Sequence, residues 1–90
     1  KAHTVFLGCN GIDPVFGVTN INLPETEIKR HMLRAAKRRI LVADGSKIGK
    51  VELANTCNID EIDLLITDSS ADPAILSTLR ESGLEIMIGL

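Results

Sequence analysis

Short hydrophobic runs recur along the chain between polar segments, and they define the expected strands. The clearest runs cover residues 4–7, 40–43, 63–67 and 84–88, each followed by Gly or Asp. The run at 40–43 shows no polar alternation, which is typical of a strand covered on both faces of a parallel sheet. Residues 51–57 predict a weaker edge strand of mixed polarity. Residues 10–22, punctuated by two glycines and a proline, are expected to form a loop.

The first expected helix covers residues 25 to about 39. Pro24 precedes it at a favoured first helical position, and acidic Glu25 suits the positive end of the helix dipole. Apolar residues recur at helical spacing and predict the buried face: Ile28, Met32, Ala35, Ala36 and Ile40. Basic residues crowd the end of this segment, where they would complement the negative end of the dipole.

The second expected helix begins at Asp72, an N-cap residue, followed by Pro73 at the first helical position. It is expected to run to about Ser82, with its leucines facing inward, and to stop at Gly83. Strands thus alternate with helices. This order predicts the α/β class, with a mostly parallel open sheet and helices on its faces. Residues 1–90 are expected to form one partial domain, because the chain starts inside a strand.

Composition and charge exclude several classes of function. Aromatic residues are 2% of the chain, too few for a platform that stacks single-stranded nucleic acid. The net charge of −2 gives no overall electrostatic footprint for DNA. Cysteines and histidines are scattered without metal-ligand spacing, so neither a metal nor another cofactor is expected. No apolar run approaches the ~20 residues needed to span a bilayer, and we expect a cytoplasmic protein.

Polar residues follow three of the expected strands, at residues 8–13, 44–49 and 67–70. If the strands are parallel, these loops open on one edge of the sheet, where ligands bind in open α/β folds. In the second loop, Lys47 can meet a phosphate, Ser46 adds a hydroxyl donor, and Asp44 suits sugar hydroxyls. The alternative for this loop is a simple turn built on Asp and Gly.

The remaining candidates come from the first loop and the first helix. Asn10 and Asp13 beside Gly11 suit a polyol ligand, although Asn-Gly is equally a tight-turn dipeptide. Glu25 and Lys29 stand near the start of the helix and could close over the same crevice. The basic residues between 29 and 39 could instead contact DNA phosphates, but a solvated helix face or a subunit contact fits an acidic chain better. No nucleophile–histidine arrangement indicates a catalytic residue.

Taken in order, these motifs resemble one family. They are Phe6-Leu7-Gly8-Cys9-Asn10-Gly11-Ile12-Asp13, Gly17-Val18-Thr19, Glu25 with Lys29-Arg30 and Met32, Leu41-Val42-Ala43-Asp44-Gly45-Ser46-Lys47-Ile48-Gly49, and Ile62-Asp63-Leu64-Leu65-Ile66-Thr67-Asp68. The ordered set resembles the second half of the C-terminal sensor domain of DeoR-family transcriptional repressors. It covers nearly the whole chain.

This resemblance implies a fold and a function. The fold would be like that of ribose-5-phosphate isomerase, and the effector would be a phosphorylated sugar or polyol. Asn10, Asp13, Asp44 and Lys47 match the family's pocket, as do Glu25 and Lys29 less closely. DNA would be held only by a separate N-terminal winged helix, which is absent here, and the regulator would control carbohydrate metabolism as a homo-oligomer.

Two alternatives remain at this point. One is a fragment of a sugar-phosphate isomerase or deaminase that uses a carboxylate as general base, since the fold is shared with such enzymes. Asn10 stands where many family members carry Asp, which weakens isomerase-like proton transfer. The other is an assembly surface, in which exposed strand edges pair with another copy of the chain.

Overall fold

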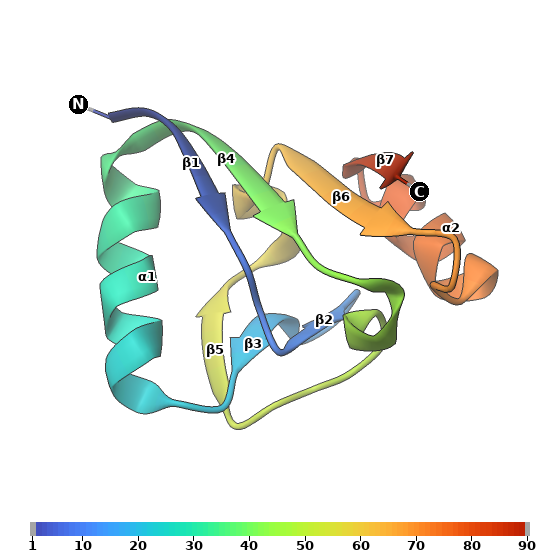
Figure 1. Ribbon diagram of the computed structural model, residues 1–90, viewed down its shortest axis with the longest axis horizontal. Helices are drawn as coiled ribbons and strands as arrows, with labels where there is room; N and C mark the ends of the chain where they lie inside the picture. Colours follow the sequence, from blue (N-terminus) through green and yellow to red (C-terminus); the bar gives the residue numbers. More distant parts are fainter. Residues whose placement is uncertain (1, 90) are drawn as a thin grey trace.

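The computed structural model describes residues 2–89 as two small sheets and two helices (Figure 1). The elements in chain order are β1 (Ala2–Leu7), β2 (Gly11–Asp13), β3 (Gly17–Asn20), α1 (Leu23–Ala35), β4 (Ala36–Val42), η1 (Gly45–Lys47), β5 (Ala54–Cys57), η2 (Ile59–Glu61), β6 (Leu64–Asp68), α2 (Pro73–Glu81) and β7 (Glu85–Gly89), where η marks a 3₁₀ turn. Each of the four clearest expected strands is present. The α/β class is confirmed.

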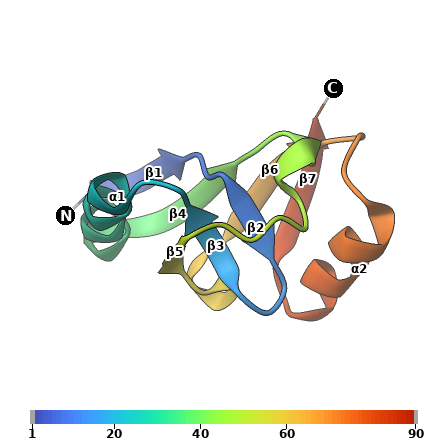
Figure 2. The same cartoon turned by 90° about the horizontal axis from the view of Figure 1, so that it is seen from below.

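The larger sheet has the strand order β1-β4-β6-β7, and every neighbouring pair is parallel. Strands are therefore added in one direction as the chain proceeds. Since crossover connections are right-handed, both helices are placed on the same face of this sheet. Leu33 of α1 and Leu79 of α2 accordingly join one core cluster with Leu41 and Leu65 of the sheet. Figure 2 shows the helices and the smaller sheet gathered against the larger one.

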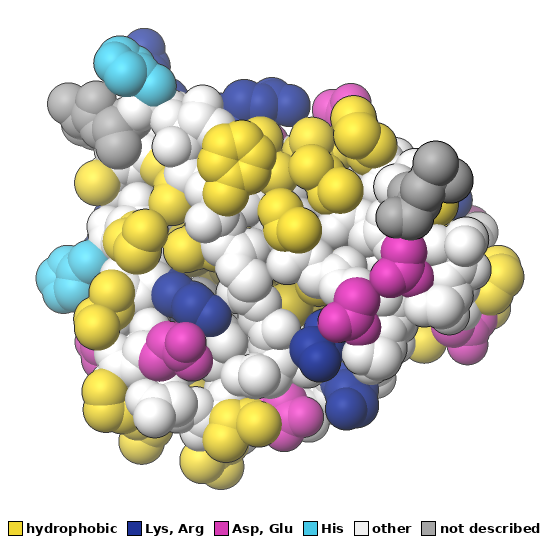
Figure 3. Space-filling model, in the orientation of Figure 1, with side chains coloured by type: hydrophobic (Ala, Val, Ile, Leu, Met, Phe, Trp, Pro, Cys, Tyr) yellow, Lys and Arg dark blue, Asp and Glu magenta, His cyan; other side chains and the backbone are white. Residues whose placement is uncertain are grey.

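The opposite face of the parallel sheet is only partly covered by residues 2–89, where Ile40 and Leu64 are buried but their neighbours are not. The strand register sets two rows of apolar side chains on it: Phe6, Ile40 and Leu64, and Val42, Ile66 and Met87. Phe6 is 62% exposed and Met87 is 53% exposed. Figure 3 shows hydrophobic side chains clustered over the middle of β1, β4 and β6. The main core cluster therefore lies on the other side of the sheet, with Leu41 and Leu65.

The smaller sheet corrects the expected loop at residues 10–22. This segment forms an antiparallel hairpin of β2 and β3, and β3 also pairs with β5 in the order β2-β3-β5. The sequence hides these strands because they are short and include the buried polar residues Thr19 and Asn20. The Asn20 side chain accepts a hydrogen bond from Thr56 Oγ1 at 2.6 Å, so its burial is compensated. β5 is an edge strand, but it is shorter than the expected 51–57 and lies in this antiparallel sheet rather than in the parallel one.

The expected first helix is wrong at its end and in its buried face. α1 stops at Ala35, and Ala36 begins β4, so Lys37, Arg38 and Arg39 lie on a strand rather than in the last helical turns. Pairing with β1 decides this boundary, because it joins Ala36 to Ala2 and continues along the strand.

The helix turns Thr26 and Leu33 toward the core, whereas Ile28 is 61% exposed and Met32 is 42% exposed. Ala35 is exposed as well, so the helical part of the predicted stripe is on the surface, whereas Ala36 and Ile40 are buried as predicted but lie in β4. Helical spacing alone identified a face that the tertiary packing does not use.

The expected second helix is confirmed in its start, its inner face and its end. Asp72 caps α2 by accepting a hydrogen bond from Ala74 N at 2.9 Å, and Leu76 and Leu79 are buried. Gly83 follows the helix with a φ of 102°, a left-handed conformation that favours glycine. Among residues 2–89, neither helix has the length and apolar character needed to cross a membrane.

Candidate functional site

The loops that follow β1, β4 and β6 meet at one edge of the parallel sheet, as the sequence predicts. Gly45 N in the second loop donates to Asp68 Oδ2 in the third at 3.1 Å. Lys29 Nζ, on α1, donates to the carbonyl oxygen of Gly8 in the first loop at 2.9 Å. These contacts define the strand-end rim, the polar edge formed by residues 8–10, 44–47 and 68–70.

Cys9 is the buried centre of the strand-end rim. Burial raises the pKa of its thiol to about 11, while the positive charges of Lys29 and Lys47 act in the opposite direction and the Asp44 carboxylate adds to the rise. Two ammonium groups and a carboxylate, from α1 and from the loop after β4, therefore lie close enough to influence this thiol. Lys29, Asp44 and Lys47 thus lie near the same thiol, and burial leaves Cys9 protonated and poorly reactive.

The Asp44–Lys47 segment forms a 3₁₀ turn, η1, rather than an open loop. Asp44 Oδ1 accepts hydrogen bonds from Ser46 N at 2.9 Å and from the Ser46 hydroxyl, and these bonds lower the pKa of the Asp44 carboxyl. Asp44 Oδ2 lies 3.8 Å from Lys47 Nζ. A Cβ atom at Gly45 would stand 2.4 Å from Ala71 N, so only glycine fits here. Both the turn and the binding interpretations of this segment are compatible with its geometry.

The loop after β6 has the same Asp–Ser hydrogen-bond pattern as the Asp44–Lys47 turn. It adds Asp68, which is not among the predicted site residues. Asp68 Oδ1 accepts from Ser70 N at 2.9 Å and from the Ser70 hydroxyl, which with Gly45 N lowers the pKa of the Asp68 carboxyl. The preceding Thr67 hydroxyl is buried and has no hydrogen-bond partner within residues 2–89. The spacing Asp-x-Ser at the ends of two successive strands was the signal that could have identified Asp68.

Asn10 joins the strand-end rim to the smaller sheet. Its Oδ1 accepts hydrogen bonds from Asn20 Nδ2 at 3.2 Å and from Ile21 N at 3.0 Å. The oxygen is thus committed within the protein, and the amide nitrogen is the part of Asn10 that remains for a ligand. Asn20 is a buried polar residue that the predicted site lacks. Its place between Asn10 and Thr56 depends on the hairpin that the sequence did not indicate.

Gly11, Asp13 and Glu25 take positions at the margin of the site. A Cβ at Gly11 would lie 2.4 Å from the carbonyl oxygen of Lys50, so this position is set by close backbone packing. Asp13 Oδ2 accepts from the backbone nitrogens of Val15 and Phe16 at 2.8 and 2.9 Å, which closes the β2–β3 hairpin. The Glu25 side chain is 53% exposed and lies 3.8 Å from Lys29 Nζ.

The arrangement suits binding of an anion better than acid–base catalysis. The carboxylates of Asp13, Asp44 and Asp68 each accept backbone hydrogen bonds, and the lowered pKa values of Asp44 and Asp68 make them weak bases. The Lys29 and Lys47 side chains are 14% and 31% exposed, so both charges lie partly inside the surface. Within residues 2–89, no group of three or more His, Cys, Asp or Glu side chains could hold a metal ion.

Comparison with known proteins identifies the family. The model of the DeoR C-terminal sensor domain matches residues 1–69, which include all of the strand-end rim except the last residue of its third loop. The chain belongs to this family. The predicted resemblance to DeoR-type regulators is therefore confirmed.

Individual relatives of this DeoR sensor chain are transcriptional regulators. The chain is 34% identical over 86 residues to the HTH-type transcriptional regulator GlpR of Haloferax volcanii, a match that covers 96% of the chain and 34% of that protein. It is 30% identical over 87 residues to GolR of Listeria innocua, covering 97% of the chain and 34% of GolR. It is 33% identical over 84 residues to the putative aga operon transcriptional repressor of Escherichia coli O157:H7, covering 93% and 31%.

The chain spans about a third of the length of these relatives. The relatives named here are regulators and not enzymes, which confirms the prediction that this domain belongs to a regulator. The alternative of an isomerase or deaminase fragment is not supported by them.

Proposed function

We propose that this chain is the effector-binding part of a transcriptional repressor of carbohydrate metabolism and that its strand-end rim binds a phosphorylated sugar or polyol. The observation that carries the proposal is the convergence of Lys29, Lys47 and Asp44 around Cys9 at the carboxyl ends of β1 and β4. Ligands of open α/β sheets bind at this edge. Two partly buried ammonium groups favour a dianionic phosphate there, because low solvent exposure strengthens their attraction.

The existing contacts of the two lysines leave them available to a ligand. Lys47 is 3.8 Å from Asp44, a separation at which a partly exposed ion pair stabilises the fold by only about 0–1 kcal/mol. A phosphate can therefore replace Asp44 as the partner of Lys47 at small cost. Lys29 donates to a neutral carbonyl oxygen at Gly8, and its ion pair with the exposed Glu25 at 3.8 Å is as weak as that of Lys47, so its other N–H donors can bind a second anion oxygen.

The neighbouring polar groups would select the rest of the ligand. The Asn10 amide nitrogen and the Asp44 Oδ2 atom offer a donor and an acceptor for sugar or polyol hydroxyls. The Ser46 hydroxyl is bonded to Asp44 and can rotate toward the phosphate. Gly11, Asp13 and Glu25 would shape the margin of the pocket. The likeness to ribose-5-phosphate isomerase remains a prediction.

The whole protein's partners belong to the same proposal. The matched region covers about a third of each named relative, and we assign DNA binding to a domain outside residues 1–90. Effector binding would then act by favouring one arrangement of the regulator over another, with a coupling free energy of about 1–3 kcal/mol. A cytoplasmic location and self-association of the regulator complete the proposal, and solution mass measured across concentrations tests the latter.

The decisive experiment is a thermal-shift screen of the whole protein against phosphorylated sugars and polyols, followed by Lys47→Ala. We expect one or more phosphorylated compounds to raise the midpoint and the unphosphorylated parent compound to have a weaker effect. Lys47→Ala should remove the ligand-induced shift while operator DNA binding persists, because within residues 2–89 the Lys47 side chain pairs only with Asp44.

Lys50→Ala is the matched control, since Lys50 is exposed and follows the same turn without entering the rim. The Lys50 variant should respond to the ligand as the natural protein does. An unchanged shift in Lys47→Ala, or an equal loss in both variants, refutes the assignment of the phosphate to the strand-end rim.

A further inference from the structure

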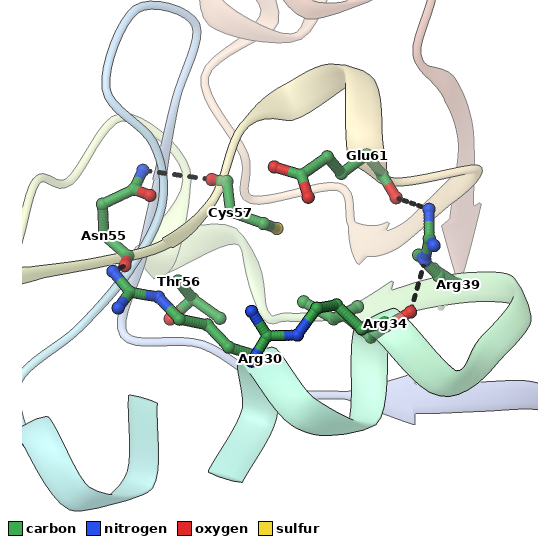
Figure 4. A pocket seen from close by; sticks show the side chains of 8 residues that line it. Arg30, Arg34, Arg39, Asn55, Thr56, Cys57 and Glu61 are labelled. Atoms are coloured by element: carbon green, nitrogen blue, oxygen red, sulfur yellow. Dashed lines mark hydrogen bonds between the residues drawn. The ribbon is translucent and has the colours of Figure 1, made fainter. Parts of the chain in front are cut away.

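A second charged pocket lies between α1, β5 and η2, away from the strand-end rim. It has a volume of about 250 Å³. Its lining includes three guanidinium groups, from Arg30 and Arg34 on α1 and Arg39 on β4. Figure 4 shows the Arg34 side chain between the other two, with Asn55, Thr56 and Cys57 of β5 facing it. One carboxylate, that of Glu61, belongs to the same lining.

Two of the three arginines are held in place, Arg39 by carbonyl oxygens alone and Arg30 by a carbonyl oxygen together with the carboxylate of Glu27. Arg39 Nε donates to the carbonyl oxygen of Leu33 at 2.7 Å, and its Nη1 donates to that of Glu61 at 3.4 Å. Arg30 Nη2 donates to the carbonyl oxygen of Asn55, and its Nη1 is 3.2 Å from the exposed carboxylate of Glu27. Carbonyl oxygens fix the orientation of a guanidinium but do not neutralise its charge.

Arg34 completes the cluster and has no hydrogen-bond or ion-pair partner within residues 2–89. It stands four residues after Arg30, so both side chains leave the same face of α1. The Glu61 carboxylate is already engaged, because its Oε2 accepts from Asn58 N at 2.8 Å. The pocket lining therefore holds three positive charges against the Glu61 carboxylate, which is committed to a turn, while the exposed Glu27 outside the lining pairs with Arg30. Within residues 2–89, Arg34 and Arg39 have no carboxylate partner.

The two sites face different sides of α1. Lys29 reaches Gly8 at the strand-end rim, whereas the next residue, Arg30, reaches Asn55 on β5. Successive helical residues point about 100° apart, so these contacts cannot belong to one pocket. An anion bound among the arginines would be separate from the proposed effector phosphate.

We propose that the pocket of Arg30, Arg34 and Arg39 binds a tetrahedral dianion, either free phosphate or the phosphate of a small monoester. Planar guanidinium groups pair with phosphate oxygens through two parallel N–H···O bonds, and this geometry suits Arg34 best because its donors are not engaged. The anchored Arg30 and Arg39 supply charge and single donors from either side. A pocket of this size admits a phosphate group and excludes a nucleic-acid duplex from its interior.

The test measures protection of individual arginines in the whole protein. Phenylglyoxal modifies accessible guanidinium groups, and peptide mass spectrometry reports the rate at each residue. We expect inorganic phosphate, added at constant ionic strength against chloride, to slow modification of Arg30 and Arg34 at least severalfold and to leave the exposed Arg38 unchanged. A small phosphate monoester in a parallel series distinguishes the two sources of the anion, since the tighter of the two protects at the lower concentration.

Three variants make the result specific. Arg34→Gln should weaken phosphate protection of Arg30 about tenfold or more, because it removes one charge-assisted pair. Arg38→Gln is the matched control: Arg38 is an exposed arginine of β4 outside the pocket, and its loss should have no effect. Lys47→Ala should also leave the protection intact, which separates this site from the strand-end rim.

Absence of protection by both anions overturns the proposal. Equal weakening by Arg34→Gln and Arg38→Gln also overturns it, because that outcome indicates general charge screening. Protection by a DNA duplex alone, without an effect of phosphate or the monoester, shows a nucleic-acid surface in place of a small-anion pocket.

Discussion

Replacing Asn20 by Ala tests the buried polar network that supports the strand-end rim. Asn20 is 1% exposed, accepts a hydrogen bond from Thr56 Oγ1 at 2.6 Å, and donates to Asn10 Oδ1 at 3.2 Å. Thr56 is 4% exposed, and its hydroxyl loses this partner in the variant. Leaving a buried hydroxyl without a partner costs about 1–3 kcal/mol. Asn10 is half-buried and retains Ile21 N, so its oxygen loses less.

Lost packing around Asn20 adds to that cost, and we expect Asn20→Ala to lower the free energy of unfolding by about 2–4 kcal/mol. The assay is urea denaturation followed by circular dichroism, with the four proteins of a double-mutant cycle measured under the same conditions. Thr56→Val is the second single variant, and it leaves the Asn20 oxygen without its donor. Each single substitution leaves one buried polar group without its hydrogen-bond partner, the Thr56 hydroxyl or the Asn20 oxygen. The double variant removes both groups.

The double variant should therefore be less destabilised than the sum of the two singles, by about 1–2 kcal/mol. Unchanged m values would show that the comparison concerns the native state. Strict additivity, or a loss below about 0.5 kcal/mol for Asn20→Ala, would falsify the view that this network is a buried and mutually dependent unit.

Two further predictions concern ionisation. Hydrogen bonds from Ser46 and Ser70 lower the pKa values of Asp44 and Asp68 from an ordinary 3.8, so their contribution to stability is fully present above pH 3.8 and is lost as the pH falls through the lower folded values. In an acid titration, Asp68→Asn should therefore lose stability less steeply below pH 3.8 than the natural protein. A stability curve parallel to that of the natural protein contradicts this prediction. Burial raises the pKa of Cys9 to about 11 and that of Cys57 to about 12. Both thiols should therefore react with iodoacetamide at pH 8 far more slowly in the folded protein than in the urea-unfolded chain. Equal reaction rates in the two states would count against their burial.

Local chemistry made a large part of the fold predictable. Hydrophobic runs such as 40–43 and 63–67 stand between clear stop signals, so their strands and the parallel order followed from the sequence. The start of α2 was equally clear, because Asp72 and Pro73 fit their positions by side-chain and backbone chemistry alone. The convergence of loops at the strand ends then followed from topology rather than from any single residue.

The errors occurred where a distant partner decides the structure. The segment after Ala35 has helical spacing, but pairing with β1 converts it to β4. Residues 11–20 form a hairpin whose buried Asn20 accepts a hydrogen bond from Thr56. No local sequence pattern predicts a bond between residues so far apart in the chain. The exposure of Ile28 follows from which side of α1 meets β5 and the smaller sheet. Residue types in the site could be predicted, but their mutual hydrogen bonds could not.

The placement of Lys29 and Arg30 on adjacent positions of α1 has a mechanical consequence. An α-helix moves as a stiff rod, so a small turn of α1 about its own axis carries both side chains with it. A ligand that draws Lys29 away from Gly8 must also shift Arg30 relative to Asn55. Binding of a ligand at the strand-end rim would then change the affinity of the arginine pocket for its anion. Thermodynamic linkage requires that binding in the arginine pocket change the affinity of the rim by the same factor.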